Sequence, residues 1–279
     1  GCQLQHITYE GQLSLKTQKV KDVIERIGHQ NPDLVKPTLG PKNPWAYRNK
    51  MQMPVGGTKG NILMGFYAMG SHDIVQGTNC PIQDEGNNII AQACYQIAKE
   101  LDVEPYDEHT GKGVLRHIIG RIGQSGWMVI LVTATDNLPH QEKWVKNLTE
   151  RVPQVETIVH NVNGKRTNVI LGPKNRILYG DGTITDHIKD LRFTLSPHSF
   201  FQVNPEQTTV LYDQALKYAD LKGNETVIDA YCGTGTISLF LAHKAKHVIG
   251  IEIVEPAIIN ARENARRNGY DNTEFIVAD

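Results

Sequence analysis

VIDAYCGTGT, at residues 227–236, is the stretch of sequence that decides the fold. The segment 226–230 is apolar and β-branched, as expected of a strand buried on both faces of a parallel sheet. Gly233 and Gly235 lack a Cβ, so the backbone can turn sharply there and approach a ligand closely. Residues 237–245 follow as a predicted helix. The stretch therefore predicts a strand, a glycine turn and a helix at the carboxyl edge of an open sheet, where α/β folds bind ligands.

The next predicted strand, residues 247–251, ends in Glu252, a residue type suited to accept hydrogen bonds from both hydroxyls of a ribose. Ser238 stands where a third glycine would complete the G-x-G-x-x-G pattern of dinucleotide-binding proteins. The pattern favours S-adenosylmethionine over a dinucleotide. A nicotinamide or flavin enzyme, and a glycine turn without any ligand, remain alternatives on these residues alone.

Three further motifs carry a resemblance to a known family: SFFQVNP at 199–205, DAYCGTGTISLFLA at 229–242 and GIEIVEPAIINARENARRNG at 250–269. The amino-terminal segments agree, namely GCQLQH at 1–6, YRNK at 47–50, GFY at 65–67, SHDIV at 71–75, DE at 107–108 and RH at 116–117. Over nearly its whole length the chain resembles the RNA (uracil-5-)-methyltransferase family, most closely its bacterial 23S rRNA members. The resemblance implies a transferase of rRNA processing that is RNA-binding and makes 5-methyluridine.

The resemblance implies an α/β fold with a Rossmann-like class I methyltransferase domain, incomplete here, after an α/β RNA-engaging domain. We expect residues 1–192 to form the RNA-engaging domain and residues 193–279 the first part of the cofactor domain. The family's S-adenosylmethionine positions fall on Gln202, Tyr231, Thr236, Glu252 and Asp279, together with Gly233 and Gly235. Relatives can carry asparagine at the position of Thr236.

Methylation of uracil C5 requires a thiolate that adds at C6 and a base that removes the C5 proton. In the family both follow an Asp-Pro-Pro segment late in the domain, and neither appears before Asp279. We therefore expect a chain truncated at both ends, with catalytic residues unknown here. Cys232 is predicted to be a buried loop residue rather than the nucleophile. A tRNA methyltransferase and a non-catalytic RNA-binding paralogue are the alternatives.

Cys2 and Cys80 lie among polar residues, and in the resembling family a four-cysteine 4Fe-4S cluster uses three amino-terminal cysteines and one distant one. These two fit its third and fourth ligands, so the full-length protein could hold the cluster; ordinary cysteines are the alternative. Cys94 belongs to a helical stripe with Ile90 and Ile97, which predicts core packing.

Candidate RNA contacts come from cations interleaved with aromatic residues in the first seventy positions, above all Arg48, Lys50 and Tyr67. A solvated hairpin with aromatic core positions would explain the same pattern. Arg116, His117 and Arg121 form a second candidate group. The formal net charge of −1 requires any basic face to be local.

The composition fits a globular protein, because 39% hydrophobic residues over 279 positions can build a large core. No apolar run approaches the length of a membrane span, so we expect no membrane partner. Four cysteines favour a reducing compartment, and we expect a cytoplasmic monomer. The histidines lack the short paired spacing of a zinc site.

Overall fold

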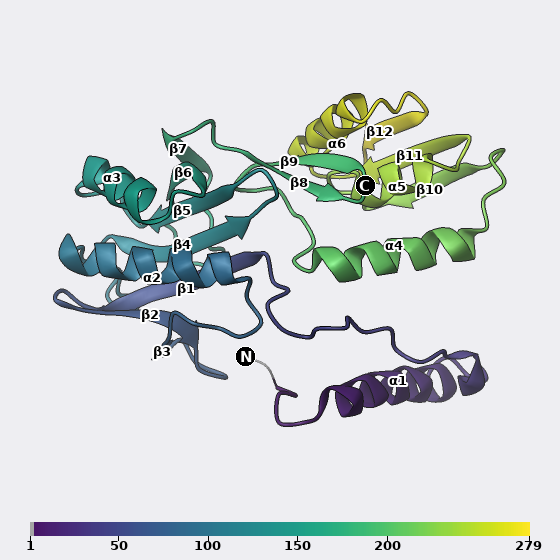
Figure 1. Ribbon diagram of the computed structural model, residues 1–279, viewed down its shortest axis with the longest axis horizontal. Helices are drawn as coiled ribbons and strands as arrows, with labels where there is room; N and C mark the ends of the chain where they lie inside the picture. Colours follow the sequence, from purple (N-terminus) through teal and green to yellow (C-terminus); the bar gives the residue numbers. More distant parts are fainter. Residues whose placement is uncertain (1–2) are drawn as a thin grey trace.

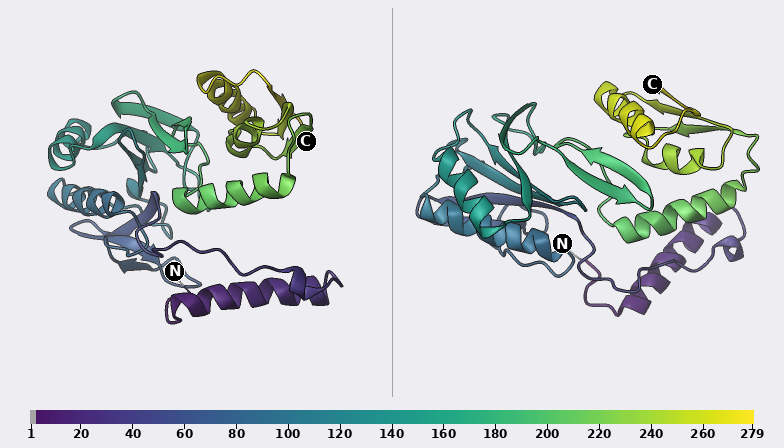
Figure 2. Two further views of the ribbon diagram at one scale, coloured as in Figure 1. Left: turned by 45° about the vertical axis from the view of Figure 1, so that its right-hand side comes forward. Right: turned by 45° about the horizontal axis from the view of Figure 1, so that its top comes forward.

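The computed structural model describes residues 3–279, which form two α/β bodies joined through a β-hairpin, with an amino-terminal helix alongside (Figures 1 and 2). That helix, α1 (Tyr9–Arg26), has no fully buried residue. A short 3-10 helix, η1 (Pro32–Leu34), follows it. A groove of about 810 Å³ separates α1 from α4 (Pro205–Ala219). None of the helices in the described part of the chain is long and apolar enough to cross a membrane.

The first body is built on a seven-stranded mixed sheet with the order β3-β2-β1-β4-β5-β6-β7. Its strands are β1 (Lys50–Thr58), β2 (Asn61–Tyr67), β3 (Ile74–Gln76), β4 (Leu115–Ile122), β5 (Trp127–Thr133), β6 (Val155–Val162) and β7 (Lys174–Tyr179). β5 and β6 run parallel, because α3 (Gln141–Arg151) connects them, and the other neighbours are antiparallel. This arrangement fits the rule that parallel strands need a crossover connection.

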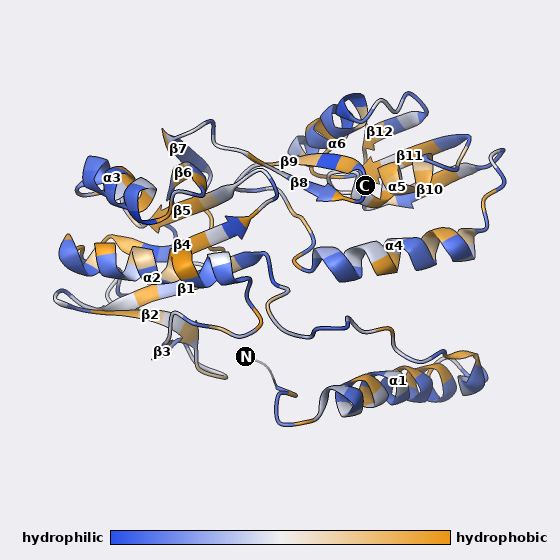
Figure 3. Cartoon of the chain, viewed as in Figure 1, coloured by the Kyte–Doolittle hydropathy of each residue, from blue (hydrophilic) through white to orange (hydrophobic). Residues whose placement is uncertain are grey.

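One face of this sheet is covered by α2 (Glu85–Glu100) and α3. Asp84 begins α2 by accepting a hydrogen bond from the Gly86 amide at 2.8 Å, the usual role of an N-cap aspartate. The stripe that includes Ile90 and Cys94 is fully buried, which confirms core packing for this cysteine. Figure 3 shows hydrophobic residues on the strands and largely polar residues on α3.

The opposite face of the sheet packs against the hairpin β8 (Ile184–Ile188) and β9 (Leu191–Leu195). Because side chains alternate along a strand, Ile118 of β4 faces α2 whereas Ile119 faces the hairpin. Phe193 of β9 lies in one continuous cluster with Ile119 and with Phe240 of the second body. Packing through the hairpin therefore fixes the two bodies relative to each other.

The second body contains three parallel strands in the order β10-β11-β12. They are β10 (Thr226–Ala230), β11 (His247–Glu252) and β12 (Thr273–Val277), connected by α5 (Thr236–Ala242) and α6 (Glu255–Arg267). The strand, glycine turn and helix order is as predicted, and the α/β class is confirmed. The expectation of a strand buried on both faces was wrong, because β10 has no fully buried residue and Ile228 is 65% exposed. α5 ends at Ala242, three residues before the predicted end, because the Lys244 and Ala245 amides both turn back to the Leu241 carbonyl.

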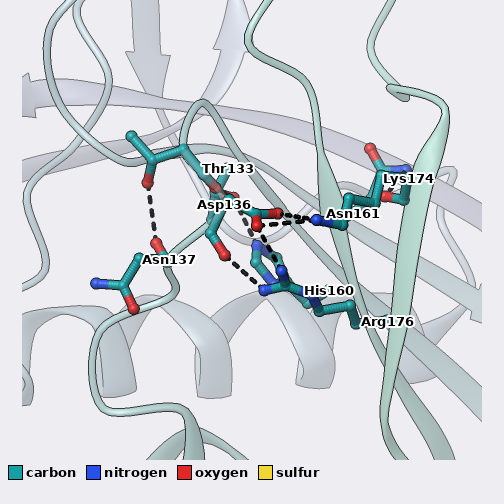
Figure 4. A network of polar contacts seen from close by, with 8 residues as sticks. Thr133, Asp136, Asn137, His160, Asn161, Lys174 and Arg176 are labelled. Atoms are coloured by element: carbon teal, nitrogen blue, oxygen red, sulfur yellow. Dashed lines mark hydrogen bonds and ion pairs between the residues drawn. The ribbon is translucent and has the colours of Figure 1, made fainter.

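A polar network at the carboxyl ends of β5 and β6 fixes the loop that follows β5 (Figure 4). The hydroxyl of Thr133 lies 2.6 Å from Nε2 of the buried His160. Asp136 pairs with Lys174 at 2.7 Å and with Arg176 at 2.5 Å, which joins this loop to β7. We interpret this network as structural, because its members bond to one another and to backbone carbonyls.

Candidate functional site

The glycine loop leaves β10 through three residues in the left-handed region of backbone space: Tyr231 at φ 65°, Gly233 at 56° and Gly235 at 78°. A Cβ on Gly233 would meet no heavy atom within 4 Å, so the surface beside it is open. A Cβ on Gly235 would lie 3.0 Å from the Phe275 ring, so this glycine is required by packing. The Gly235 amide closes the turn on the Cys232 carbonyl at 2.9 Å.

Glu252 ends β11 beside this loop. Its carboxylate accepts hydrogen bonds from the Gly233 amide at 3.2 Å and the Val254 amide at 3.0 Å. These contacts hold the side chain at the carboxyl edge of the sheet, and each oxygen keeps a second lone pair for a ligand hydroxyl. The backbone of Ala278 donates to the Glu252 carbonyl at 3.2 Å, which places the exposed Asp279 next to Glu252.

Tyr231 presents its ring to solvent, with 87% of the residue exposed. Thr236, at the first turn of α5, shares a hydrogen bond of 2.8 Å with the Tyr212 hydroxyl of α4. Gln202 lies half-buried before α4, and its side chain makes no hydrogen bond within residues 3–279. Tyr231, Gly233, Glu252 and Asp279 thus gather at one edge, whereas no side-chain hydrogen bond joins Gln202 to them in the described structure.

Two supports of the loop were missed by sequence reasoning. Ser238 of α5 donates a short hydrogen bond to the Asp229 carboxylate of β10, which ties the helix to the strand before the loop. Burial raises the pKa of Asp229 above its ordinary value. The Tyr212–Thr236 contact is the second support. Each pair joins residues of two separate elements, so its partners could not be paired from the sequence. The only sequence signal was a polar residue inside an apolar segment.

Lys50 and Arg48 belong to a cationic cluster where the first body meets the SFFQVNP segment. Lys50 of β1 pairs in register with Arg121 of β4. Burial, then the neighbouring Arg121 and Arg48, lower the pKa of Lys50 to about 8. Arg121 donates to the carbonyls of Pro197 and Ser199. Burial, Arg121 and Lys50 also lower the pKa of His198, so four basic groups share this place.

Tyr67 lies in a different cluster. Its hydroxyl donates to Glu108 at 3.1 Å, and its ring stacks on His72. The second candidate group is divided by the structure, since Arg121 joins Lys50 while Arg116 and His117 join Tyr67. Arg116 is 4% exposed and donates to two backbone carbonyls, so much of its guanidinium is committed to the fold.

Among the cysteines, Cys80 is half-buried and Cys2 lies outside the described residues. Within residues 3–279 no group of three or more histidine, cysteine or acidic side chains has the arrangement of a metal site. Burial raises the pKa of Cys94. Burial, with Asp229 and Glu252 nearby, raises the pKa of Cys232 to about 12, so its thiol stays protonated at neutral pH.

Residues 221–279, which include the glycine loop, match the family model of a methyltransferase domain. The whole chain is 50% identical over 281 residues to an uncharacterized RNA methyltransferase of Halalkalibacterium halodurans, covering 100% of this chain and 61% of the relative. It is 49% identical over 281 residues to one of Clostridium tetani, with the same coverage.

The crystal structure of the Pyrococcus abyssi tRNA (uracil-54, C5)-methyltransferase in complex with S-adenosyl-L-homocysteine resembles the entire chain. The TM-score is 0.82 and the identity 26%, covering 100% of this chain and 65% of that one. The chain is therefore similar over its whole length to RNA methyltransferases, as its motifs predict, and its second body has a Rossmann-like fold. It spans about three fifths of the length of the curated relatives that it matches.

Proposed function

We propose that this protein is an S-adenosylmethionine-dependent RNA methyltransferase that methylates C5 of uracil. The observation that carries the proposal is the similarity over the entire chain to RNA methyltransferases, together with the glycine loop and Glu252 at one sheet edge. The likeness to the Pyrococcus abyssi enzyme supports uracil C5 as the target atom.

The residues at the sheet edge fit S-adenosylmethionine, which supplies the methyl group. The open surface at Gly233 admits a ligand close to the backbone, and the Glu252 carboxylate suits ribose hydroxyls. The exposed ring of Tyr231 offers a packing surface, and Asp279 extends the acidic edge toward the adenine side. We propose that Gly235 and Thr236, which shape the loop, also belong to the cofactor site, and that Gln202 binds the methionine end.

Carbon C5 becomes nucleophilic only when a thiolate adds to C6, and loss of the C5 proton then expels the thiolate. Cys232 does not suit this role, since its thiol is held protonated beside two carboxylates. Cys94 is fully buried in the first body. Because we assign Cys2 and Cys80 to a metal cluster, we propose that the nucleophilic cysteine and the base belong to residues other than these 279.

For the substrate we propose 23S rRNA, to which the motifs point, with tRNA as the second candidate because the similar solved structure is a tRNA enzyme. Arg48 and Lys50 would contact phosphates, and Tyr67 would contact RNA at its separate cluster. In this proposal residues 1–192 engage RNA, residues 193–279 begin the cofactor domain, and the protein acts as a cytoplasmic monomer. The target base must leave its stack to reach the cofactor.

We further propose that Cys2 and Cys80 ligate a 4Fe-4S cluster in the full-length protein. The described residues do not form such a site by themselves, because a cubane needs four thiolates and residues 3–279 contain no group of three or more histidine, cysteine or acidic side chains that could hold a metal ion. Iron and sulfide analysis of anaerobically purified full-length protein tests this idea, and absence of both elements would refute it.

Nucleoside mass spectrometry tests the main proposal. The complete gene product is incubated with S-adenosylmethionine and with unmodified ribosomal or transfer RNA. We expect new 5-methyluridine in 23S rRNA. A signal confined to tRNA would select the second candidate, and no signal in either RNA despite cofactor binding would favour a non-catalytic RNA-binding paralogue.

A further inference from the structure

Two adjoining hollows, lined by both polar and apolar residues, lie on the first body and include none of the glycine-loop residues. The first has a volume of about 200 Å³ and is lined by β1, β2 and the segment before β4. The second, of about 190 Å³, shares His72, Tyr106, Glu108 and Arg116 with the first. Together they reach the size of a small-ligand site, roughly 300 Å³ or more.

An aromatic platform borders both hollows. The rings of Tyr67 and His72 stack with centroids 4.8 Å apart and planes 19° apart. A single carboxylate, Glu108, holds both rings, because it accepts from the Tyr67 hydroxyl at 3.1 Å and lies 2.5 Å from Nδ1 of His72. The His72 side chain is 58% exposed, so one ring of a preorganised stack is available to an unpaired base.

The wall beside this platform is rich in hydrogen-bond acceptors, since Asp73, Asp107 and Glu108 line the first hollow. Burial alone would raise the pKa of Glu108, but hydrogen bonds from His72 and Tyr67 lower it below its ordinary value. An ionised wall attracts the amino hydrogens of cytosine, adenine or guanine. It repels the two carbonyl oxygens that flank the single N3–H donor of uracil, so this site differs in chemistry from a pocket for the methylated base.

The second hollow is lined by two arginines. Arg166 donates to the Thr110 carbonyl at 2.5 Å and keeps further N–H donors. Arg116 stacks on Tyr106, at 4.5 Å from the ring centroid, and its buried Nε has no partner within residues 3–279. The buried Nδ1 of His117 is likewise unpartnered in the described structure. Unmet buried polar groups are costly, and they favour occupation by a polar ligand.

We propose that these hollows bind one unpaired nucleotide of the RNA substrate, with its base stacked on His72, its amino edge toward Asp73 and Glu108, and its phosphate at Arg166. This inference rests on the proposed RNA-modifying function and adds a subsite for a nucleotide other than the target uracil. The subsite would select RNA sequence or shape next to the target.

Fluorescence anisotropy with labelled oligocytidine and oligouridine of about 12 nucleotides tests the subsite, because one exocyclic amino group replaces one carbonyl between the two bases. We expect the protein to prefer oligocytidine, and His72→Ala to weaken its binding about tenfold through lost stacking. Asp73→Asn, combined with Glu108→Gln, should abolish the preference. The exposed residues His243 and Asp271, outside the hollows, provide matched controls in His243→Ala and Asp271→Asn.

Asp73→Asn alone keeps the test valid if the double variant fails to fold, since the Asp73 carboxylate is exposed and makes no hydrogen bond within residues 3–279. That variant should reduce the preference while its thermal midpoint stays unchanged. Equal binding of both oligonucleotides, or site variants that behave like the controls, would overturn the subsite. Formation of 5-methyluridine would still support the main function in that case, whereas its absence would reject that function separately.

Discussion

Replacing Gly235 with alanine should destabilise the protein much more than the same change at Gly233 or Gly269. The three glycines have φ values of 78°, 56° and 72°, so an alanine at each costs about 1–2 kcal/mol in the left-handed region. Only at Gly235 does the new Cβ meet neighbours, at 3.0 Å from two carbons of the Phe275 ring and 3.1 Å from the Cβ of Ala261. Both neighbours are buried.

Overpacking of this kind adds about 1–3 kcal/mol. Gly235→Ala should therefore lower the free energy of unfolding by about 2–5 kcal/mol, against about 1–2 kcal/mol for Gly233→Ala and Gly269→Ala. Urea unfolding followed by circular dichroism measures all three variants under one set of conditions.

The comparison separates packing from backbone strain, because all three glycines share a left-handed conformation and only Gly235 has close neighbours. Equal losses at all three positions would refute the assignment of Gly235 to packing. Gly233→Ala has a second expected result, a weaker affinity for S-adenosylmethionine, since its Cβ would enter the open surface assigned to the cofactor. Gly269→Ala should leave that affinity unchanged.

Four further predictions concern charge. Burial raises the pKa of Asp186 to about 6, so the folded state binds more protons than the unfolded state between about pH 4 and 6. The free energy of unfolding should fall as pH rises through this window, and Asp186→Asn should remove this dependence. Urea unfolding at several pH values measures it, and the same dependence in the variant would contradict the raised pKa of Asp186. Lys50→Gln should weaken RNA binding and reduce the slope of the logarithm of the binding constant against the logarithm of the salt concentration by about 0.7–0.9. Lys59→Gln, which removes an exposed ion pair with Asp102, should change neither. Because the pKa of Lys50 is about 8, this side chain loses its charge as pH rises past that value, and RNA affinity should decline. Calorimetric titration with RNA below and above this pH measures the change, and equal affinities would contradict the prediction. Glu252→Gln should weaken S-adenosylmethionine binding about tenfold in equilibrium dialysis, through the weaker hydrogen bond to a ribose hydroxyl, and an affinity equal to that of Glu255→Gln would reject this role.

The glycine loop could be predicted from sequence because its signals are local. Two glycines between an apolar strand and a helix define the turn within ten residues, and Glu252 follows at the end of the next strand. The end of α5 was less predictable from sequence, because only the backbone hydrogen bonds of residues 243–245 mark it. Local chemistry therefore determines the presence of each element more firmly than its last turn.

The grouping of the basic residues could not be predicted from spacing. Lys50 and Arg121 are far apart in the chain, and they meet because the antiparallel register of β1 and β4 places them opposite each other. Arg116 and Arg121 are close in sequence, yet they belong to different clusters on the same strand. Register is set by tertiary pairing, so a list of nearby cations does not define a binding surface.

The link between the cationic cluster and the glycine loop follows from how Arg121 is held. Its guanidinium donates to the Pro197 and Ser199 carbonyls, and the same segment continues into Gln202 and α4. Phe201 of this segment and Cys232 of the glycine loop belong to the apolar cluster that joins the sheet, the hairpin and the second body. A rotation between the two bodies would have to break these hydrogen bonds and expose this core. The cationic cluster and the glycine loop are therefore held in a fixed relation, as required for RNA bound on one body to present a base to a cofactor on the other.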